Sequence, residues 1–228
     1  KMTSLIKSII NENVLGKTVL IRADLNLPIS NGEILDQSRV ERVTPTINFL
    51  KLSGAKIVIC SHLGRPNGKY NKKYTLKPLV EILSNILQTN VRFSASCIGQ
   101  DTLNIKTSLK AGEILLLENV RFHEEETINS LSFAKKLSEG CDLFVNDAFS
   151  CSHRAHASIS KITEFLPSFA GLQLEIEINA LKKVTTDIKK PITCIIGSSK
   201  ISTKIGIVKN LIPKFNNIII VGGMANNI

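Results

Sequence analysis

Six short apolar runs are spread along this 228-residue chain, and each ends in residues that carry oxygen atoms, amides or positive charge. The runs lie at 19–23, 57–60, 114–117, 143–145, 194–196 and 218–221. Near-continuous apolar runs of this length are typical of parallel strands that are buried on both faces of a sheet. In such sheets, ligands bind beyond the carboxyl ends of the strands. We therefore expect the chemistry of the protein in the segments that follow the runs.

Helical patterns alternate with these runs, which indicates βαβ units. The helices that apolar periodicity predicts lie at 38–52, 76–87, near 129–138 and at 171–187. Gly54 is a stop signal for the first helix, and Thr75 is a candidate N-cap for the second. A short strand is predicted at 91–93, and Asn31-Gly32 marks a turn. The predicted fold class is α/β, a Rossmann-like parallel sheet with helices on both faces.

The last predicted helix is where we expect the domain boundary. This places one domain at 1–171, an interdomain helix at 172–187 and a second domain at 188–228. Only two strands and one helix are predicted after the boundary, which is too little to cover a parallel sheet on both faces. We therefore expect the second domain to be incomplete in this chain.

The charge balance favours an anionic partner. Lysine and arginine together number 29 against 19 acidic residues, so the net charge is +10. Phosphorylated metabolites, nucleic acid or an acidic surface would all suit it, and a merely solvated lysine surface is the alternative. Because there is no long basic run or basic–aromatic repeat, we expect no nucleic-acid partner.

Localisation is predicted from two further features. No apolar stretch approaches the roughly 20 residues that span a bilayer, and no signal peptide is visible, so we expect no membrane association. The five cysteines are odd in number and form no C-x-x-C pair, which favours a reducing compartment. We therefore expect a cytoplasmic protein.

The segment 61–66, Ser-His-Leu-Gly-Arg-Pro, is the densest candidate site. His62 and Arg65 offer donor or cationic side chains after a strand, and Gly64 allows close backbone approach. A guanidinium binds phosphate in a two-pronged manner, so an anion site is one interpretation. An ordinary Gly-Pro turn with surface charges is the other.

Three residues near the first strand are also candidates. Asp24 and Asn26 alternate with a leucine, so both can face one way beyond the strand and contact a substrate hydroxyl or carboxylate. Turn capping is the alternative, because Asp and Asn often serve it. Arg39 opens a helix and opposes the helix dipole, which hints at a ligand role, and a solvated arginine is the alternative.

Later segments add more cationic groups. Arg121 follows the third run, and 153–156 reads His-Arg-Ala-His. We expect no metal there because no third ligand is evident. Asp147 is expected to order its loop. The segment 197–204 has the small residues and lysines of a phosphate loop, although it lacks the Walker A spacing. The joint placement of these cations at one sheet edge predicts polyanionic substrates.

Together these segments resemble the phosphoglycerate kinase family. The similar motifs are R-A-D-L-N-L-P, S-H-L-G-R-P, L-L-L-E-N-V-R-F-H-E-E-E, F-V-N-D-A-F, H-R-A-H-A-S and I-S-T-K-I, in the family's order from about Asn13 onward. The resemblance implies a phosphoglycerate-binding domain, an interdomain helix and the start of a nucleotide-binding domain. It implies reversible phosphoryl transfer between 1,3-bisphosphoglycerate and ADP, giving 3-phosphoglycerate and ATP in glycolysis.

The resemblance also implies residue roles. Asp24 and Asn26 would hold the hydroxyl end of 3-phosphoglycerate, and Arg39 would contact its carboxylate and act in catalysis. The 3-phosphate would be gripped by His62, Arg65, Arg121 and Arg154, with Leu63 and Gly64 in the same substrate site. Lys200 would act on the transferred phosphoryl group. Lys204, Gly197 and Ser198 would contact the nucleotide, which binds with Mg²⁺. No residue is assigned as a metal ligand, and a monomer with hinge-bending domains is implied.

Departures from the family pattern leave an alternative open. Ser198 stands where the family has glycine, which restricts the phosphate loop, and the later nucleotide-binding segments of the family are not found. We expect this chain alone to bind 3-phosphoglycerate without kinase activity. The alternative is a truncated, non-catalytic fragment that binds phosphorylated anions only.

Overall fold

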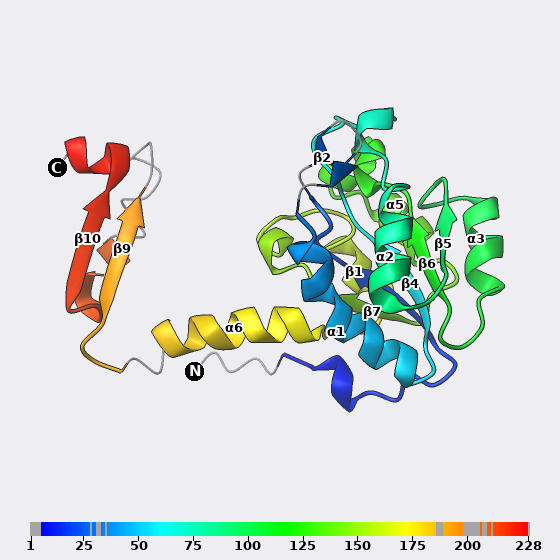
Figure 1. The fold of residues 1–228 in the computed structure, drawn as a ribbon, viewed down its shortest axis with the longest axis horizontal. Coiled ribbons are helices and arrows are strands. Elements are labelled where there is room, and N and C mark those ends of the chain that lie inside the picture. Colours follow the sequence, from blue (N-terminus) through cyan, green and yellow to red (C-terminus); the bar gives the residue numbers. More distant parts are fainter. Residues whose placement is uncertain are drawn as a thin grey trace. The chain divides into compact units, whose positions relative to one another are not determined.

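The computed structural model describes residues 6–27, 29–30, 33–34, 36–185, 189–197, 206, 209–210 and 212–227. Two compact units are distinguished, Lys1–Glu175 and Ile176–Ile228 (Figure 1). The division falls within α6 (Leu172–Thr185), the helix that was predicted to join two domains. The functional boundaries at 1–171, 172–187 and 188–228 stay predictions.

The first unit is built on a six-stranded sheet with the order β5-β6-β4-β1-β7-β8. Its strands are β1 (Thr18–Arg22), β4 (Lys56–Cys60), β5 (Val91–Ser94), β6 (Ile114–Leu117), β7 (Leu143–Asn146) and β8 (Ser168–Ala170). Every neighbouring pair is parallel, as the first four apolar runs predicted. Those runs are the four central strands. Arg22 is level with Cys60 and Asn146, so the ends of three strands lie at the same height.

Alternate residues of each strand enter two different cores, one on each face of the sheet. Val19 and Ile21 pack into the core that includes α1 (Ser38–Leu52) and α2 (Leu79–Leu87). Leu20 points to the opposite core, which includes α5 (Leu131–Ser138) and the 3₁₀ helix η5 (Lys161–Glu164). Helices therefore cover both faces of the sheet, as predicted (Figure 1).

Helix α1 has the predicted bounds, and its buried residues recur at the predicted spacing. Val40, Val43, Ile47 and Leu50 are all buried, because they form one apolar stripe at helical spacing. The chain turns away directly after the helix. There Gly54 has a φ of +74°, a conformation that glycine adopts without a steric penalty.

The prediction for the second helix was wrong at its start. Helix α2 begins at Leu79, and Thr75 does not cap it. The Thr75 hydroxyl instead donates to a Glu118 carboxylate oxygen at 2.6 Å. Proline disfavours helical geometry at the residue before it, so Pro78 keeps Lys77 out of the helix. The carboxylate at the end of β6 thereby ties the start of this segment to the sheet.

Other elements were missed or begin elsewhere. Helix α3 (Gln100–Thr107) was not predicted because its buried positions include the polar residues Thr102 and Lys106. Strand β8 has only three residues. Helix α5 begins two residues late because Asn129 has a φ of +58°. The remaining short elements are β2 (Ile29–Ser30) and β3 (Glu33–Ile34), which pair antiparallel, and α4 (Glu124–Thr127). The predicted turn at 31–32 lies outside the described residues.

The second unit contains the last two apolar runs. These are β9 (Thr193–Gly197) and β10 (Asn217–Val221), a parallel pair followed by the 3₁₀ turn η7 (Gly222–Asn227). Apolar side chains on these strands stay exposed, with Ile195 at 67% and Ile219 at 47%. Within the described residues of both units, the structure contains no helix long and apolar enough to cross a membrane.

Candidate anion-binding site

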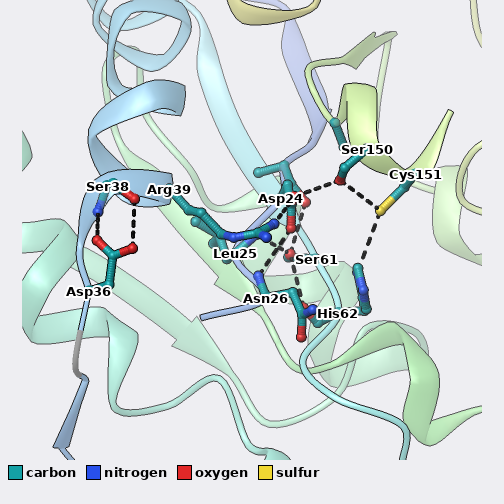
Figure 2. Close-up of polar contacts among 12 residues, drawn as sticks. Asp24, Leu25, Asn26, Asp36, Ser38, Arg39, Ser61, His62, Ser150 and Cys151 are labelled. Carbon is teal, nitrogen blue, oxygen red and sulfur yellow. Dashed lines mark hydrogen bonds and ion pairs between the residues drawn. The ribbon is translucent and has the colours of Figure 1, made fainter. Parts of the chain in front are cut away.

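Loops that follow β1, β4 and β7 bring candidate residues to one edge of the sheet (Figure 2), and Arg121, which follows β6, donates to the Gly64 carbonyl there. Asp24, after β1, forms an ion pair with Arg39 from the first turn of α1. The Ser150 hydroxyl, from the loop after β7, donates to the same carboxylate at 2.6 Å. The ion pair with Asp24 holds the Arg39 guanidinium in place, and the Arg39 side chain is still 39% exposed to solvent.

The loop after β4 is fixed by its backbone. The Gly64 N–H donates to the Asn26 side-chain oxygen at 2.8 Å, and the Gly64 carbonyl accepts a hydrogen bond from Arg121 at 2.8 Å. Gly64 has a φ of +61°, and a Cβ built there would lie 2.4 Å from Cε1 of Tyr74. Only glycine meets both conditions. A cavity of about 130 Å³ beside this loop is lined by Asn26, Leu27, Leu63, Gly64, Lys73 and Tyr74.

Asn119, which the sequence analysis did not single out, connects three of these segments. Its buried amide donates to the carbonyls of Leu63 and Tyr74 at 2.8 and 2.9 Å. Its side-chain oxygen accepts the Arg121 N–H at 3.0 Å. An amide has both donors and an acceptor, so it can hold two carbonyls and an N–H together. Asn119 therefore sets where the Arg121 backbone lies relative to the loop after β4.

A cationic cavity of about 370 Å³ lies at this edge. It is lined by Arg65, Asn67, Gly68, Arg121, Thr127, Arg154 and His156. The Nε atoms of Arg121 and Arg154 are buried, and neither has a hydrogen-bond partner in the part of the chain that the structure describes. A buried donor without a partner is unfavourable by about 1–3 kcal/mol. An anion with several oxygen atoms would satisfy both guanidinium groups.

His62 does not line this cavity, but it is close to the same arginines. It is buried, and its Nδ1 lies 3.0 Å from Nη2 of Arg22. Burial lowers the pKa of His62 to about 2, and the charges of Arg22, Arg121 and Arg154 add to this shift. The ring is therefore neutral at physiological pH. It can serve an anion as a hydrogen-bond donor, and it adds no positive charge.

Acid sensitivity is expected from His62. Its folded-state pKa of about 2 lies below the ordinary 6.5, so between these values only the unfolded chain binds the proton. The free energy of unfolding should therefore fall as the pH decreases below 6.5, by up to about 1.4 kcal/mol per pH unit for this one group. Urea unfolding of wild type and His62→Gln from pH 7 to pH 4 measures the difference in slope.

Equal slopes would contradict a neutral, buried His62. The comparison between two variants is needed because Asp147 acts in the opposite direction. Burial raises the pKa of Asp147 to about 6, so the folded chain keeps a proton there that the unfolded chain releases. That contribution favours the folded state at low pH and is lost as the pH rises through 6. It is common to both proteins and cancels in the difference.

Asp147 was expected to order its own loop, and its carboxylate contacts the start of α6. Its carboxylate accepts the N–H of Leu174, in the first turn of α6, at 3.1 Å. A Cβ at Gly171 would lie 2.3 Å from Oδ1 of Asp147, so the chain passes very close to the carboxylate. Asp147 therefore secures the start of α6.

Most of the residues predicted to contact the nucleotide are not among the described residues. Ser198, Lys200 and Lys204 lie outside the described residues. Gly197 is the last residue of β9, and a Cβ there would lie 2.9 Å from a Val221 methyl group. No group of three or more His, Cys, Asp or Glu side chains suited to a metal ion occurs among the residues with described positions.

Comparison with known proteins identifies the family. The family model described as phosphoglycerate kinase matches residues 9–228. The chain belongs to the phosphoglycerate kinase family. The resemblance of the six sequence motifs is thereby confirmed, and so is the α/β fold class.

Curated relatives carry the same family name. The phosphoglycerate kinase of Leptospira biflexa serovar Patoc is 46% identical over 214 residues, which are 94% of this chain and 54% of the relative. That of Wolbachia pipientis wMel is 48% identical over 222 residues, covering 97% of this chain and 56% of the relative. The chain therefore spans about half the length of the curated phosphoglycerate kinases that it matches.

Solved structures of the family share the fold. Phosphoglycerate kinase from Coxiella burnetii matches with a TM-score of 0.87 and 38% identity. The enzyme from Pyrococcus horikoshii OT3 matches with a TM-score of 0.88 and 32% identity. Each match covers 97% of this chain and 56% of the solved chain.

Proposed function

We propose that this chain binds 3-phosphoglycerate at the cationic edge of its first unit. We also propose that it takes part in reversible phosphoryl transfer between 1,3-bisphosphoglycerate and ADP. The observation that carries the proposal is the cavity with three arginines, two of which have buried Nε donors without partners among the described residues. Membership of the phosphoglycerate kinase family supports 3-phosphoglycerate as the bound anion. Nothing in the comparisons favours the non-catalytic alternative.

Arg65, Arg121 and Arg154 would hold the 3-phosphate, because guanidinium groups bind its oxygen atoms in pairs. His62 would add a neutral donor. At the other end of the substrate, Asp24 and Asn26 would contact the hydroxyl group. Asn26 also holds Gly64, which links this end to the phosphate end through Arg121. Leu63 would contribute to the wall of the substrate site.

Arg39 would contact the substrate carboxylate and stabilise the phosphoryl group during transfer. Its ion pair with Asp24 keeps the guanidinium beside the proposed hydroxyl site while leaving it partly exposed. Phosphoryl transfer requires positioning and charge stabilisation more than covalent chemistry, which fits a site of arginines without an evident nucleophile.

The nucleotide is proposed to bind in the second unit as its magnesium complex, so that Mg²⁺ arrives as part of the substrate. Gly197, Ser198 and Lys204 would contact the nucleotide, and Lys200 would contact the transferred phosphoryl group. Closure of two hinged domains would bring the substrates together and exclude water. A cytoplasmic monomer without nucleic-acid or membrane partners belongs to the same proposal.

Calorimetric titration tests the proposal with 3-phosphoglycerate and with glycerate, which lacks the phosphate. We expect the first to bind and the second to bind much more weakly. Arg65→Ala should reduce the affinity for 3-phosphoglycerate about tenfold, since a hydrogen bond to a charged group contributes about 1.5 kcal/mol. Arg92→Ala is the matched control, because Arg92 is a half-exposed arginine on β5 that pairs with Glu113. Equal affinity for both ligands would overturn the assignment of the phosphate site.

A further inference from the structure

A chain of buried polar side chains begins at Glu126 and ends at His62. Glu126 accepts hydrogen bonds from the Ser158 hydroxyl at 2.6 Å and from the Ser158 N–H at 2.9 Å. The Ser158 oxygen in turn accepts a hydrogen bond from Nε of Arg22 at 2.9 Å. Arg22 then reaches the His62 ring through Nη2 at 3.0 Å and the Ala23 carbonyl through Nη1 at 2.6 Å. The contacts join β1, α4 and two loops.

Stability alone does not account for this arrangement. Burying an arginine and a glutamate is unfavourable because both lose hydration, and apolar residues of similar volume are often as stabilising. Arg22 nevertheless lies at the end of β1, a strand that is buried throughout, level with Cys60 on one side and Asn146 on the other. One reason for a protein to keep a buried ionic network is that the network fixes the position of another group. Here the group at the end of the network is His62.

Arg22 determines which nitrogen of His62 carries the proton. A guanidinium has donors and no acceptor, so the nitrogen that faces it must be an acceptor. Nδ1 faces Arg22, and a neutral imidazole with an acceptor at Nδ1 carries its proton at Nε2. Within the described residues Nε2 has no hydrogen-bond partner, so its proton is available to a ligand.

We propose that Arg22, held by Glu126 through Ser158, is a positioning residue that keeps His62 as an Nε2–H donor toward the bound anion. The identity of that anion rests on the proposed function, whereas the proton position does not. The other charged or titratable groups around His62 are Cys151, Arg121, Arg154 and His156. Cys151 has its sulfur 3.9 Å from Nδ1. A thiol that donates to Nδ1 leaves the same tautomer, whereas a proton donated from Nδ1 to the sulfur would give the opposite one.

Nitrogen-15 NMR of the histidine rings tests the proposal without any ligand. The chain has four histidines, and His62→Gln identifies the signals of His62 by their loss. We expect the two-bond ¹⁵N–¹H pattern of the Nε2–H tautomer, unchanged between pH 5 and pH 8. A pattern of the Nδ1–H tautomer, or of an imidazolium, would overturn the proposal.

Arg22→Met then distinguishes the positioning of His62 from the packing of the Arg22 side chain. Methionine keeps most of the side-chain volume and removes the hydrogen-bond donors of the guanidinium group. We expect both tautomers of His62 to appear and the affinity for 3-phosphoglycerate to fall about tenfold. Lys106→Met is the control, because Lys106 is an equally buried cation that instead bonds to the carbonyls of Leu137 and Glu139. It should lower stability and leave the His62 pattern unchanged.

Ser158→Ala keeps the test decisive if Arg22→Met does not fold, since it deletes a single hydroxyl group. It should shift the tautomer balance in the same direction, and an unchanged balance in both variants would refute positioning by Arg22. A wild-type chain that shows the Nε2–H pattern but does not bind 3-phosphoglycerate would reject the proposed function alone.

Discussion

Arg121→Ala is expected to weaken the binding of 3-phosphoglycerate about 100-fold. Arg121 is buried, lines the cationic cavity and has an Nε donor without a partner among the described residues. A buried hydrogen bond to a charged group contributes up to about 3 kcal/mol, which corresponds to two powers of ten in affinity. The effect should exceed that of Arg65→Ala, because Arg65 is exposed and water screens its charge. Calorimetric titration at one fixed ionic strength measures both.

A second role of Arg121 has to be separated from this effect. Its Nη1 donates to the Gly64 carbonyl, so the alanine variant also loosens the loop after β4. Arg121→Lys retains the charge and loses the planar fork, and its affinity should lie between wild type and Arg121→Ala. If Arg121→Lys binds 3-phosphoglycerate as tightly as wild type, the positive charge alone is sufficient for binding, and the proposal of a two-pronged contact is wrong. Thermal unfolding of each variant checks that the loss does not arise from unfolding.

Glu126→Leu is expected to destabilise the chain by about 3–5 kcal/mol. Removing one partner of a buried ionic network leaves the other charge without compensation in the interior. Here the uncompensated group is Arg22, which reaches Glu126 only through Ser158. The carboxylate also accepts the Ser158 N–H at 2.9 Å, so a second favourable interaction is lost. Urea unfolding at pH 7 gives the free-energy difference directly.

The double variant Arg22→Met, Glu126→Leu shows whether the two charges are coupled. It should be more stable than Glu126→Leu alone, because no uncompensated charge remains inside. The double-variant cycle then yields a coupling free energy, which is expected to lie within the 0.5–3 kcal/mol found for residues of one network. Strictly additive effects would mean that Ser158 does not connect the two charges.

Much of the fold follows from local sequence patterns. The central strands and α1 were predicted because apolar spacing depends only on neighbours in the chain. The same reasoning placed Arg65, Arg121 and Arg154 at one sheet edge, where the structure finds them around one cavity. Parallel strands all end at that edge, so residues that follow them gather there without any knowledge of their contacts.

The buried network could not be predicted in this way. Arg22 and Ser158 are 136 positions apart, and no periodic pattern relates them. Arg22 was counted as part of an apolar run, and Glu126 belongs to a run of three glutamates that looks solvent-exposed. A signal was nevertheless present, because an arginine inside an otherwise apolar strand requires a buried partner. The prediction of the start of α2 failed for a similar reason, because the partner of Thr75 is Glu118, 43 positions away.

The strand order also has a consequence for synthesis on the ribosome. Strand β1 is made first and pairs on one side with β4, but its other side pairs with β7, which emerges more than 100 residues later. Until then one row of its backbone N–H and C=O groups is open to other nascent chains. Charged residues on an open strand discourage such pairing, so Arg22 would protect the growing polypeptide from aggregation before β7 and Ser158 have been synthesised.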